Sequence, residues 1–282
     1  MIEYYKSNIK QAKEKNPRIR KIAMMTIVVL LLQVVLPTLT MINEDFFNIG
    51  VMASTTEEYN ISTAQELWDF AEEVNGGNTF SGTTVNLTAD ITLDCDSDNQ
   101  WIPIGTYIKN TTVECGFNGI FEGNGHSISG IYIDTEDSYQ GLFGFNTGII
   151  RNINVTDSYI NGIEEVGGIV GYNYGAGEYE GLIYNCSFSG TITAGKRENG
   201  TAKGSNQIGG IVGYNVDGKI EKCCNSATIT TVAGGQAAGG VVGLNDHGTI
   251  SECYNVGTIS AESGGGLGRH CWGQLGRYMQ LL

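Results

Sequence analysis

A six-residue block of the pattern Gly-x-x-Gly-x-Asn occurs four times in this chain and restricts its fold more than any other feature. The copies begin at Gly141, Gly168, Gly210 and Gly240, so the intervals between them are 27, 42 and 30 residues. A second glycine-led block follows each copy, and a short strand such as Gly190–Thr193 closes the unit. Repeats of this length, built from short strands and glycine turns, are typical of stacked coils. Three strands per repeat predict an all-β fold, a right-handed parallel β-helix with coils about 4.8 Å apart.

Equivalent positions of stacked coils lie above one another, so the repeat predicts continuous rows of similar side chains. We expect an aliphatic row, a row of asparagines at a turn, and an inward row in which cysteine acts as a small hydrophobe. The positions in these rows are Gly141, Phe143, Gly144 and Asn146 in the first copy, Gly168, Val170, Gly171 and Asn173 in the second, Gly210, Val212, Gly213 and Asn215 in the third, Gly240, Val242, Gly243 and Asn245 in the fourth, and Ile153, Cys186, Cys223 and Cys253 in the inward row.

One repeat position carries large side chains, namely Phe145, Tyr172 and Tyr214, and Leu244 continues it. Strict alternation along a strand puts this position on the same face as the aliphatic row, which predicts a core location. The alternative is an outward stripe that could stack on sugar rings. The core location is favoured.

The cysteine content argues for packing and against cross-linking. The chain has 7 cysteines and no C-x-x-C pair, so neither a disulfide scaffold nor a zinc ribbon is indicated. Parallel stacking would place Cys186, Cys223 and Cys253 side by side, which suits the ~90° dihedral angle of a disulfide poorly. These three residues are therefore predicted to be free thiols.

An amphipathic helix is expected over residues 61–77, ahead of the strand-rich body. Thr63 and Glu66 form a capping box, and Leu67, Phe70, Ala71 and Val74 give one apolar stripe. A helix in front of an open stack of strands predicts a cap. The expected organisation is a capping region at 54–79 and a β-helix at 80–265.

The repeats resemble the GLUG motif of exported bacterial repeat proteins, through blocks such as Gly141-Leu-Phe-Gly and Gly168-Ile-Val-Gly. Residues 101–105 and 117–130 resemble the segment that introduces those repeats, and the likeness covers about residues 60–266. It implies a right-handed β-helix on surface-associated proteins, including N-terminal regions of immunoglobulin-A-cleaving metallopeptidases and large adhesin-like proteins. It implies no catalytic residues, because the motif is structural in that family.

Residues 1–53 are predicted to be an export signal. Seven basic residues before position 22 precede an apolar run over 22–36 that Pro37 closes. Cleavage after Ala53 would leave Ser54 as the first residue, and an uncleaved anchor is the alternative. Either way the excess of Lys and Arg keeps the N-terminus cytoplasmic, sends the body outside, and makes this segment its membrane contact. With a net charge of −14 overall, the exported body repels phosphate, which excludes nucleic-acid binding.

The sequence offers little for catalysis, and no cofactor is expected. Three histidines occur without an H-E-x-x-H motif, so zinc peptidase activity has no ligands. Acidic clusters at 134–137 and 164–165 fall between predicted strands, where solvated acids are ordinary. Asp94, Asp96 and Asp98 begin like a calcium loop but lack its later glycine and glutamate, which favours a solvated acidic turn over a weak Ca²⁺ site.

The last 17 residues break the repeat, since 266–282 contain no acidic residue and no strand alternation. They are interpreted as an aberrant tail from a frameshift or truncation, with a genuine short covering tail as the alternative. An uncovered last coil would promote end-to-end self-association.

The resulting hypothesis is an exported, non-enzymatic surface module, a stalk or an adhesive that binds a host or cell-surface glycan or protein. A fragment of a larger exported enzyme, a metallopeptidase or a polysaccharide-cleaving β-helix, is the competing hypothesis.

Overall fold

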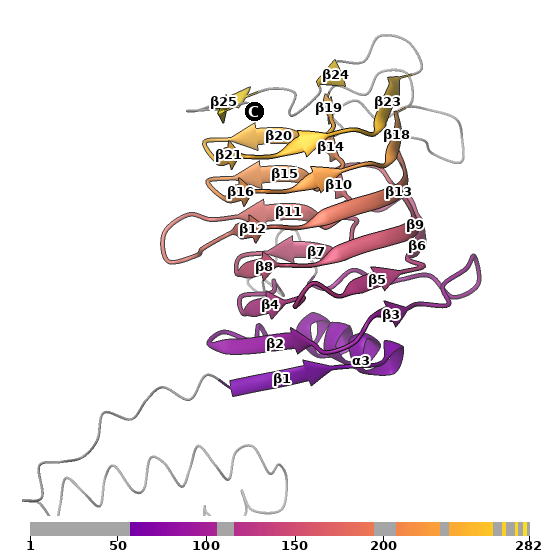
Figure 1. Ribbon diagram of the computed structural model, residues 1–282, viewed down its shortest axis with the longest axis vertical. Helices are drawn as coiled ribbons and strands as arrows, with labels where there is room; N and C mark the ends of the chain where they lie inside the picture. The colour runs from indigo at the N-terminus through magenta and orange to yellow at the C-terminus, as the bar shows by residue number, and fades with distance from the viewer. Residues whose placement is uncertain are drawn as a thin grey trace, which may run out of the picture. The chain divides into compact units, whose positions relative to one another are not determined.

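The structure, a computed structural model, describes most of the second of two units in the chain, Thr56–Leu282. Within this part the chain winds through stacked parallel strands in a β-helix-like arrangement, with one helix beside the first strands (Figure 1). The predicted export signal at 1–53 lies outside the described residues. The described residues are 57–105, 116–194, 207–231, 237–261, 267–268, 274–275 and 279–280.

The strands of the described residues form four parallel sheets. The eight-stranded sheet runs in the order β1 (Glu57–Ile61), β2 (Thr83–Leu87), β4 (Ile120–Glu122), β8 (Ile149–Arg151), β12 (Leu182–Tyr184), β16 (Lys219–Glu221), β21 (Thr249–Ser251) and β26 (Met279–Gln280). The five-stranded sheet runs in the order β7 (Phe143–Asn146), β11 (Val170–Tyr174), β15 (Val212–Val216), β20 (Val242–Asp246) and β25 (Gln274–Leu275). The four-stranded sheet runs in the order β10 (Val166–Gly167), β14 (Gln207–Gly209), β19 (Ala237–Gly239) and β24 (Leu267–Gly268).

The nine-stranded sheet closes each coil. Its strands are β3 (Ile91–Thr92), β5 (Ser127–Ser129), β6 (Tyr132–Asp134), β9 (Asn154–Gly162), β13 (Ser187–Ala194), β17 (Cys224–Asn225), β18 (Thr228–Thr231), β22 (Tyr254–Asn255) and β23 (Thr258–Ala261). A complete repeat therefore visits the four-stranded, five-stranded, eight-stranded and nine-stranded sheets in that order before the next repeat begins above it.

The strands stack in register across repeats, which aligns their inward side chains. Val170 pairs with Val212 and Val212 with Val242, and all three are fully buried. A parallel row of isoleucines is buried in the eight-stranded sheet and another in the nine-stranded sheet. The two rows are Ile150, Ile183, Ile220 and Ile250, and Ile160, Ile192 and Ile229.

Helix α3 spans Ala64–Asn75, inside the predicted range of 61–77, because β1 takes the residues before it. The Thr63 side chain accepts a hydrogen bond from the Glu66 backbone, and the Glu66 carboxylate accepts one from the Thr63 backbone. Phe70 on the apolar face meets the rings of Phe117 and Phe121, with ring centroids 5.7 and 5.9 Å away. Within the described residues no helix is both long and apolar enough to cross a membrane.

Short strands occur after residue 265, where the sequence shows no strand alternation. Strands β24, β25 and β26 pair in parallel with β19, β20 and β21, one coil further along the stack. Figure 1 labels β24 and β25 at that end. The sequence did not predict these three strands, because strand prediction relies on alternation of apolar and polar side chains, which this segment lacks. An open strand edge offers backbone N–H and C=O groups, which pair with any following backbone that adopts the same path.

Candidate functional site

The repeated asparagines form a continuous buried chain of amide hydrogen bonds. Asn146 donates to Asn173 (2.8 Å), Asn173 donates to Asn215 (2.7 Å), and Asn215 donates to Asn245 (2.7 Å). Each Nδ2 also donates to a glycine carbonyl at the following turn, at 2.7–3.1 Å. All four side chains are fully buried, so their polar groups depend on these bonds.

The turn that follows each asparagine requires glycine for reasons of space. A Cβ atom on Gly218 would lie 2.3 Å from Asn173 Nδ2, and one on Gly248 would lie 2.1 Å from Asn215 Nδ2. Distances this short are not tolerated, so the second glycine-led block of the repeat is a steric partner of the asparagine row. These glycines therefore serve the packing of the asparagine row.

The glycines of the Gly-x-x-Gly pattern let two sheets meet backbone to backbone. A Cβ on Gly171 would lie 2.6 Å from the Tyr139 backbone, and one on Gly213 would lie 2.5 Å from the Val166 backbone nitrogen. The glycines before the second and third blocks do the same, because a Cβ on Gly167 would lie 2.2 Å from the Val170 oxygen and one on Gly209 would lie 2.0 Å from the Val212 oxygen. Sequence reasoning missed this preceding glycine, although its recurrence at 167, 209 and 239 was visible.

The cysteine row is buried beside the isoleucine rows. Cys186, Cys223 and Cys253 are 2%, 0% and 8% exposed, and all three are free thiols. The Cys223 backbone N–H donates to Cys253 Sγ at 3.3 Å. Burial raises the pKa of the Cys223 thiol well above its usual range, and a hydrogen bond with Cys223 together with burial raises the pKa of Cys253.

Alkylation should distinguish these thiols from a more accessible neighbour. At pH 8 we expect iodoacetamide to modify Cys186, Cys223 and Cys253 on the order of a hundredfold more slowly than half-buried Cys224, because burial restricts access of the reagent. The raised pKa values of Cys223 and Cys253 slow these two thiols further. Unfolding without reductant should expose all three to labelling. Mass spectrometry of the labelled peptides measures both rates, and a Cys186–Cys223 bridge in the unreduced protein would contradict the prediction.

A second asparagine row was missed by the sequence analysis. Asn225 Nδ2 donates to Asn255 Oδ1 at 2.7 Å, and the Asn225 side-chain oxygen accepts the Ala227 backbone N–H at 3.1 Å. Phe188 occupies the same register position one coil earlier. The row therefore changes from apolar to amide within one sheet, and only two copies of the asparagine were available as a signal.

The aromatic stripe lies differently from its predicted core location. Phe145 is buried, but Tyr172 and Tyr214 are half-buried and neither joins the hydrophobic core. The three rings follow one another at centroid distances of 5.3 Å, and Tyr139 meets Tyr172 edge-on. Strict alternation fails here because Gly171 and Gly213 press the strand against the backbone of the preceding segment.

The hydroxyl of Tyr214 has a perturbed pKa. Its hydroxyl donates to Asp246 Oδ2 at 3.2 Å, and Asp246 Oδ1 lies 2.6 Å from His247 Nδ1. Burial first, and then the charges of Asp246 and Glu165, raise the pKa of Tyr214 to about 12. The phenol therefore stays protonated at neutral pH and serves as a hydrogen-bond donor.

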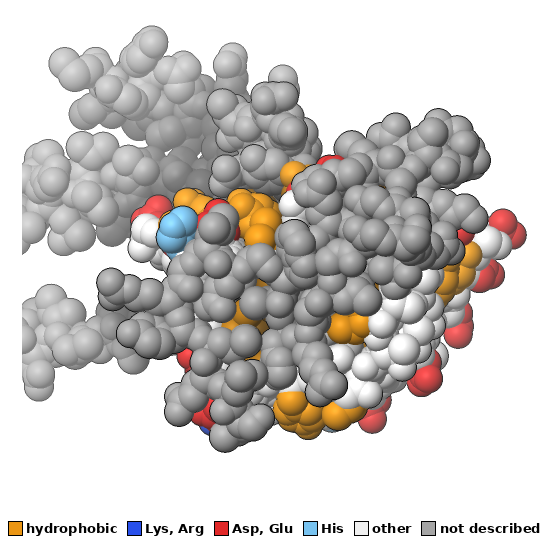
Figure 2. Space-filling model, turned by 90° about the horizontal axis from the view of Figure 1, so that it is seen from above, with side chains coloured by type: hydrophobic (Ala, Val, Ile, Leu, Met, Phe, Trp, Pro, Cys, Tyr) orange, Lys and Arg blue, Asp and Glu red, His pale blue; other side chains and the backbone are white. Residues whose placement is uncertain are grey.

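The two acidic clusters differ in exposure, because Asp134, Glu136 and Asp137 are exposed whereas Glu164 and Glu165 are half-buried. Figure 2 shows red acidic side chains along part of the edge of the described surface. Asp94, Asp96 and Asp98 lie in an exposed turn, and Asp96 Oδ1 accepts backbone N–H groups from Asp98 and Asn99 at 2.8 and 2.9 Å. That carboxylate oxygen therefore already accepts two hydrogen bonds that stabilise the turn. Among the described residues no group of three His, Cys, Asp or Glu side chains is arranged to hold a metal ion.

An ion pair that sequence reasoning missed joins Glu122 and Arg151 on the eight-stranded sheet. Arg151 Nε lies 2.6 Å from Glu122 Oε2, and Asn152 Nδ2 donates to Glu122 Oε1 at 2.9 Å. Partial burial would raise the pKa of Glu122, but the bonds from Asn152, Asn124 and Arg151 lower it overall. Both carboxylate oxygens are thus occupied by the protein, which makes this pair structural.

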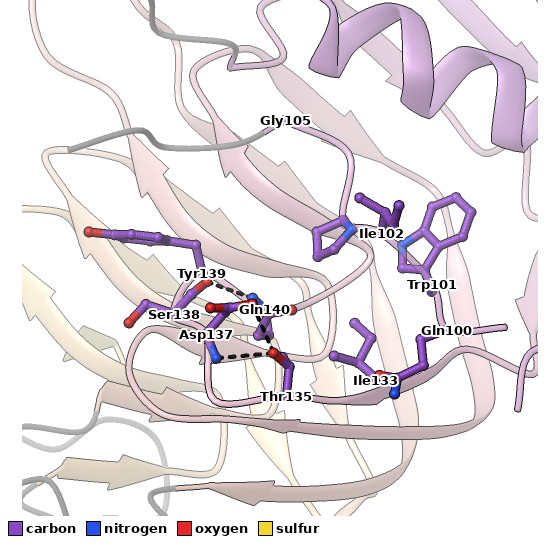
Figure 3. A pocket seen from close by; sticks show the side chains of 11 residues that line it. Gln100, Trp101, Ile102, Gly105, Ile133, Thr135, Asp137, Ser138, Tyr139 and Gln140 are labelled. Atoms are coloured by element: carbon purple, nitrogen blue, oxygen red, sulfur yellow. Dashed lines mark hydrogen bonds between the residues drawn. The ribbon is translucent and has the colours of Figure 1, made fainter. Parts of the chain in front are cut away.

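A hollow of about 520 Å³ lies between residues 100–105 and the loop at 133–140 (Figure 3). Its volume suits a small ligand. Thr135 bonds to Asp137 at 2.9 Å, and Gln140 donates to the Ser138 carbonyl at 2.6 Å, so these wall groups bind one another. Asp137 is the one carboxylate among the described residues that line it, whereas hydrolysis of glycosidic bonds ordinarily uses two.

Comparison with known proteins places three of the four repeats in one family. The model of the GLUG motif matches residues 162–193, 204–230 and 234–260, and the first predicted copy at 141–146 precedes these matches. Because the matched ranges follow β10, β14 and β19 through their complete coils, the family motif coincides with the structural repeat.

Two curated relatives are similar over part of the chain. Halomucin of Haloquadratum walsbyi is 28% identical over 148 residues, which cover 50% of this chain and 2% of halomucin. A candidate Gly-rich membrane protein of Evansella cellulosilytica is 34% identical over 127 residues, 42% of this chain and 13% of that protein. The chain therefore spans only a small share of the curated relatives it matches.

A solved structure is similar in fold. It is that of a candidate immunoglobulin A1 protease from Bacteroides ovatus, with a TM-score of 0.58 and 22% sequence identity. The match covers 76% of this chain and 64% of that one. At this identity the likeness concerns the arrangement of strands.

Proposed function

The chain is a protein of GLUG repeats, and from that premise we propose that it is an exported, non-enzymatic repeat module of a bacterial surface protein. In this proposal the stacked coils are a right-handed β-helical solenoid, α3 caps its first coil, and residues 1–53 direct export. The module serves as a stalk that also presents a binding surface. The names of the relatives, halomucin and a membrane protein, support a location at the cell surface.

One observation carries the proposal: the repeated residues are committed to packing. The asparagine amides bond to one another, the valines and cysteines are buried, and the glycines allow backbone contacts that a Cβ would block. A motif whose conspicuous residues all serve the stack is expected in a scaffold. The outward side chains, which vary between coils, are then left for recognition.

The competing function is a piece of a larger exported enzyme, and the likeness to the candidate immunoglobulin A1 protease favours it. The two functions differ in what they do to a bound protein. A scaffold leaves immunoglobulin A1 intact, whereas a protease fragment with residual activity cleaves it.

Export and the absence of turnover should both be measurable on the full chain. Expressed in a Gram-positive host, the protein should become accessible to externally added protease, and deletion of residues 1–53 should abolish that accessibility. The purified chain should leave immunoglobulin A1 uncut after prolonged incubation, with a commercial immunoglobulin A1 protease as the positive control. Retention of the intact chain in the cytoplasm, or specific cleavage of immunoglobulin A1, would overturn the proposal.

A further inference from the structure

Two rows of outward side chains run along the nine-stranded sheet. They lie on five successive rungs, and every member is exposed or half-buried. Because parallel strands lie about 4.8 Å apart, the rows extend for roughly 19 Å along the stack. We call this surface the hydroxyl face; its first row is Tyr132, Tyr159, Thr191, Thr228 and Thr258, and its second is Asp134, Asn161, Thr193, Thr230 and Ser260.

The side chains of the hydroxyl face are held in place by one another. The rings of Tyr132 and Tyr159 stack with centroids 5.2 Å apart and an angle of 25° between their planes. The Tyr159 hydroxyl lies 3.2 Å from Thr193 Oγ1, and Thr193 in turn donates to Asn161 at 3.1 Å. Asn161 donates to Asp134 at 2.7 Å. The face is therefore organised before any ligand arrives, which lowers the entropic cost of binding.

Hydrogen-bonding capacity remains on this face after these contacts. A hydroxyl can donate one hydrogen bond and accept two, and an amide can make four, so these contacts leave further acceptors and donors on the face. Thr230 and Ser260 share one contact of 3.2 Å on the upper rungs. A surface of this kind matches a partner that is itself rich in hydroxyl groups.

A shallow groove of about 310 Å³ accompanies the first row. Tyr132, Tyr159 and Thr191 line it together with Gly130 and Gly190. The two glycines have positive φ angles of 79° and 150°. A Cβ on Gly190 would lie 2.3 Å from the Ser158 carbonyl oxygen, and the strand register shifts just before this residue. Because the two glycines have no side chains, the surface beside Tyr132 and Tyr159 is left open as the groove.

We propose that the hydroxyl face binds a neutral, linear glycan whose chain lies along the stack. Sugar rings offer apolar C–H faces to the tyrosines and hydroxyl rims to the Thr, Ser and Asn side chains. The regular rungs suit a repeating chain better than a single sugar. This proposal rests on the proposed role of the chain as a surface module and names the ligand class of that module.

Charge selects a neutral glycan over an anionic one. Asp134 is the one charged member of the two rows, and Asp157 lines the groove beside them. The whole chain has 30 acidic against 16 basic residues, and Figure 2 shows red acidic side chains along part of the edge of the described surface. A uronic-acid polymer would meet like charge along its length, whereas an uncharged one would not.

Calorimetric titration with short glycans tests the site. The probes are linear hexasaccharides of xylose, mannose and glucose, with a hexasaccharide of galacturonic acid as the anionic counterpart. The full chain should bind at least one neutral probe and not the anionic one. Tyr159→Ala should weaken that binding roughly three- to tenfold through loss of the ring. Thr228→Lys, at an exposed position on the fourth rung, should weaken it comparably by obstructing the first row.

Tyr184→Ala is the matched control, because Tyr184 is a half-buried tyrosine on the eight-stranded sheet whose hydroxyl accepts Lys222 Nζ at 2.9 Å. This variant should bind like the unmodified chain, and all three variants should still unfold cooperatively on heating, which shows that they are folded. Failure to bind any neutral probe, preference for the anionic probe, or equal binding by all variants would overturn the hydroxyl face as the site. Product release from a bound probe would instead overturn the non-enzymatic function, while leaving the location of binding intact.

Discussion

Replacing Val212 by Asp should destabilise the repeat stack by more than about 4 kcal/mol, at the high end of single substitutions. Val212 is fully buried between Val170 and Val242, so the new carboxylate would face aliphatic side chains on both sides. Stacked repeats draw their stability from neighbouring interfaces, and this residue contributes to two of them. Equilibrium unfolding in denaturant, followed by circular dichroism, measures the loss.

Val256→Asp provides the control, since Val256 is 70% exposed and the same change there should cost less than about 0.5 kcal/mol. An unchanged denaturation midpoint for Val212→Asp would show that position 212 does not face the interior. The stacked-row description of the fold would then be wrong.

Asn215→Leu should cost about 3–6 kcal/mol, because it removes three buried hydrogen bonds and leaves their partners unsatisfied. Asn215 accepts from Asn173 at 2.7 Å, and donates to Gly218 at 3.0 Å and to Asn245 at 2.7 Å. Leucine has a similar volume but cannot bond to any of them. Thermal and denaturant unfolding should both report the loss.

Asn99→Leu is the comparison for this second substitution, because Asn99 is exposed in the acidic turn and should tolerate the change. If Asn215→Leu proved as mild as Asn99→Leu, the amide row would contribute little to stability. The repeated asparagine would then need another explanation.

The sequence predicted those features that repeat or that follow a single local rule. The rows of Val170, Val212 and Val242 lie in register because identical blocks recur. Helix α3 begins after Thr63 because its capping box is local and needs no knowledge of the rest of the chain. In both cases a few neighbouring residues are enough to predict the local structure.

The features that escaped prediction depend on contacts between segments far apart in the chain. Tyr172 lies outside the core because Gly171 packs on Tyr139 and Glu165, which no alternation rule includes. The hydroxyl face escaped because its pairs, such as Tyr159 with Thr193, differ in residue type from one coil to the next. Rows of unlike side chains become visible only once the register is known.

The unequal intervals between repeats have a consequence for the size of such proteins. Coils whose starts are 27 and 42 residues apart occupy the same register, so the segments between sheets do not alter the stack. Every additional coil meets the one below it through the same amide and valine contacts, and adds about 4.8 Å. The length of such a protein is therefore proportional to its number of repeats. Duplication or deletion of repeats in the gene changes this length without changing the packing of the interior.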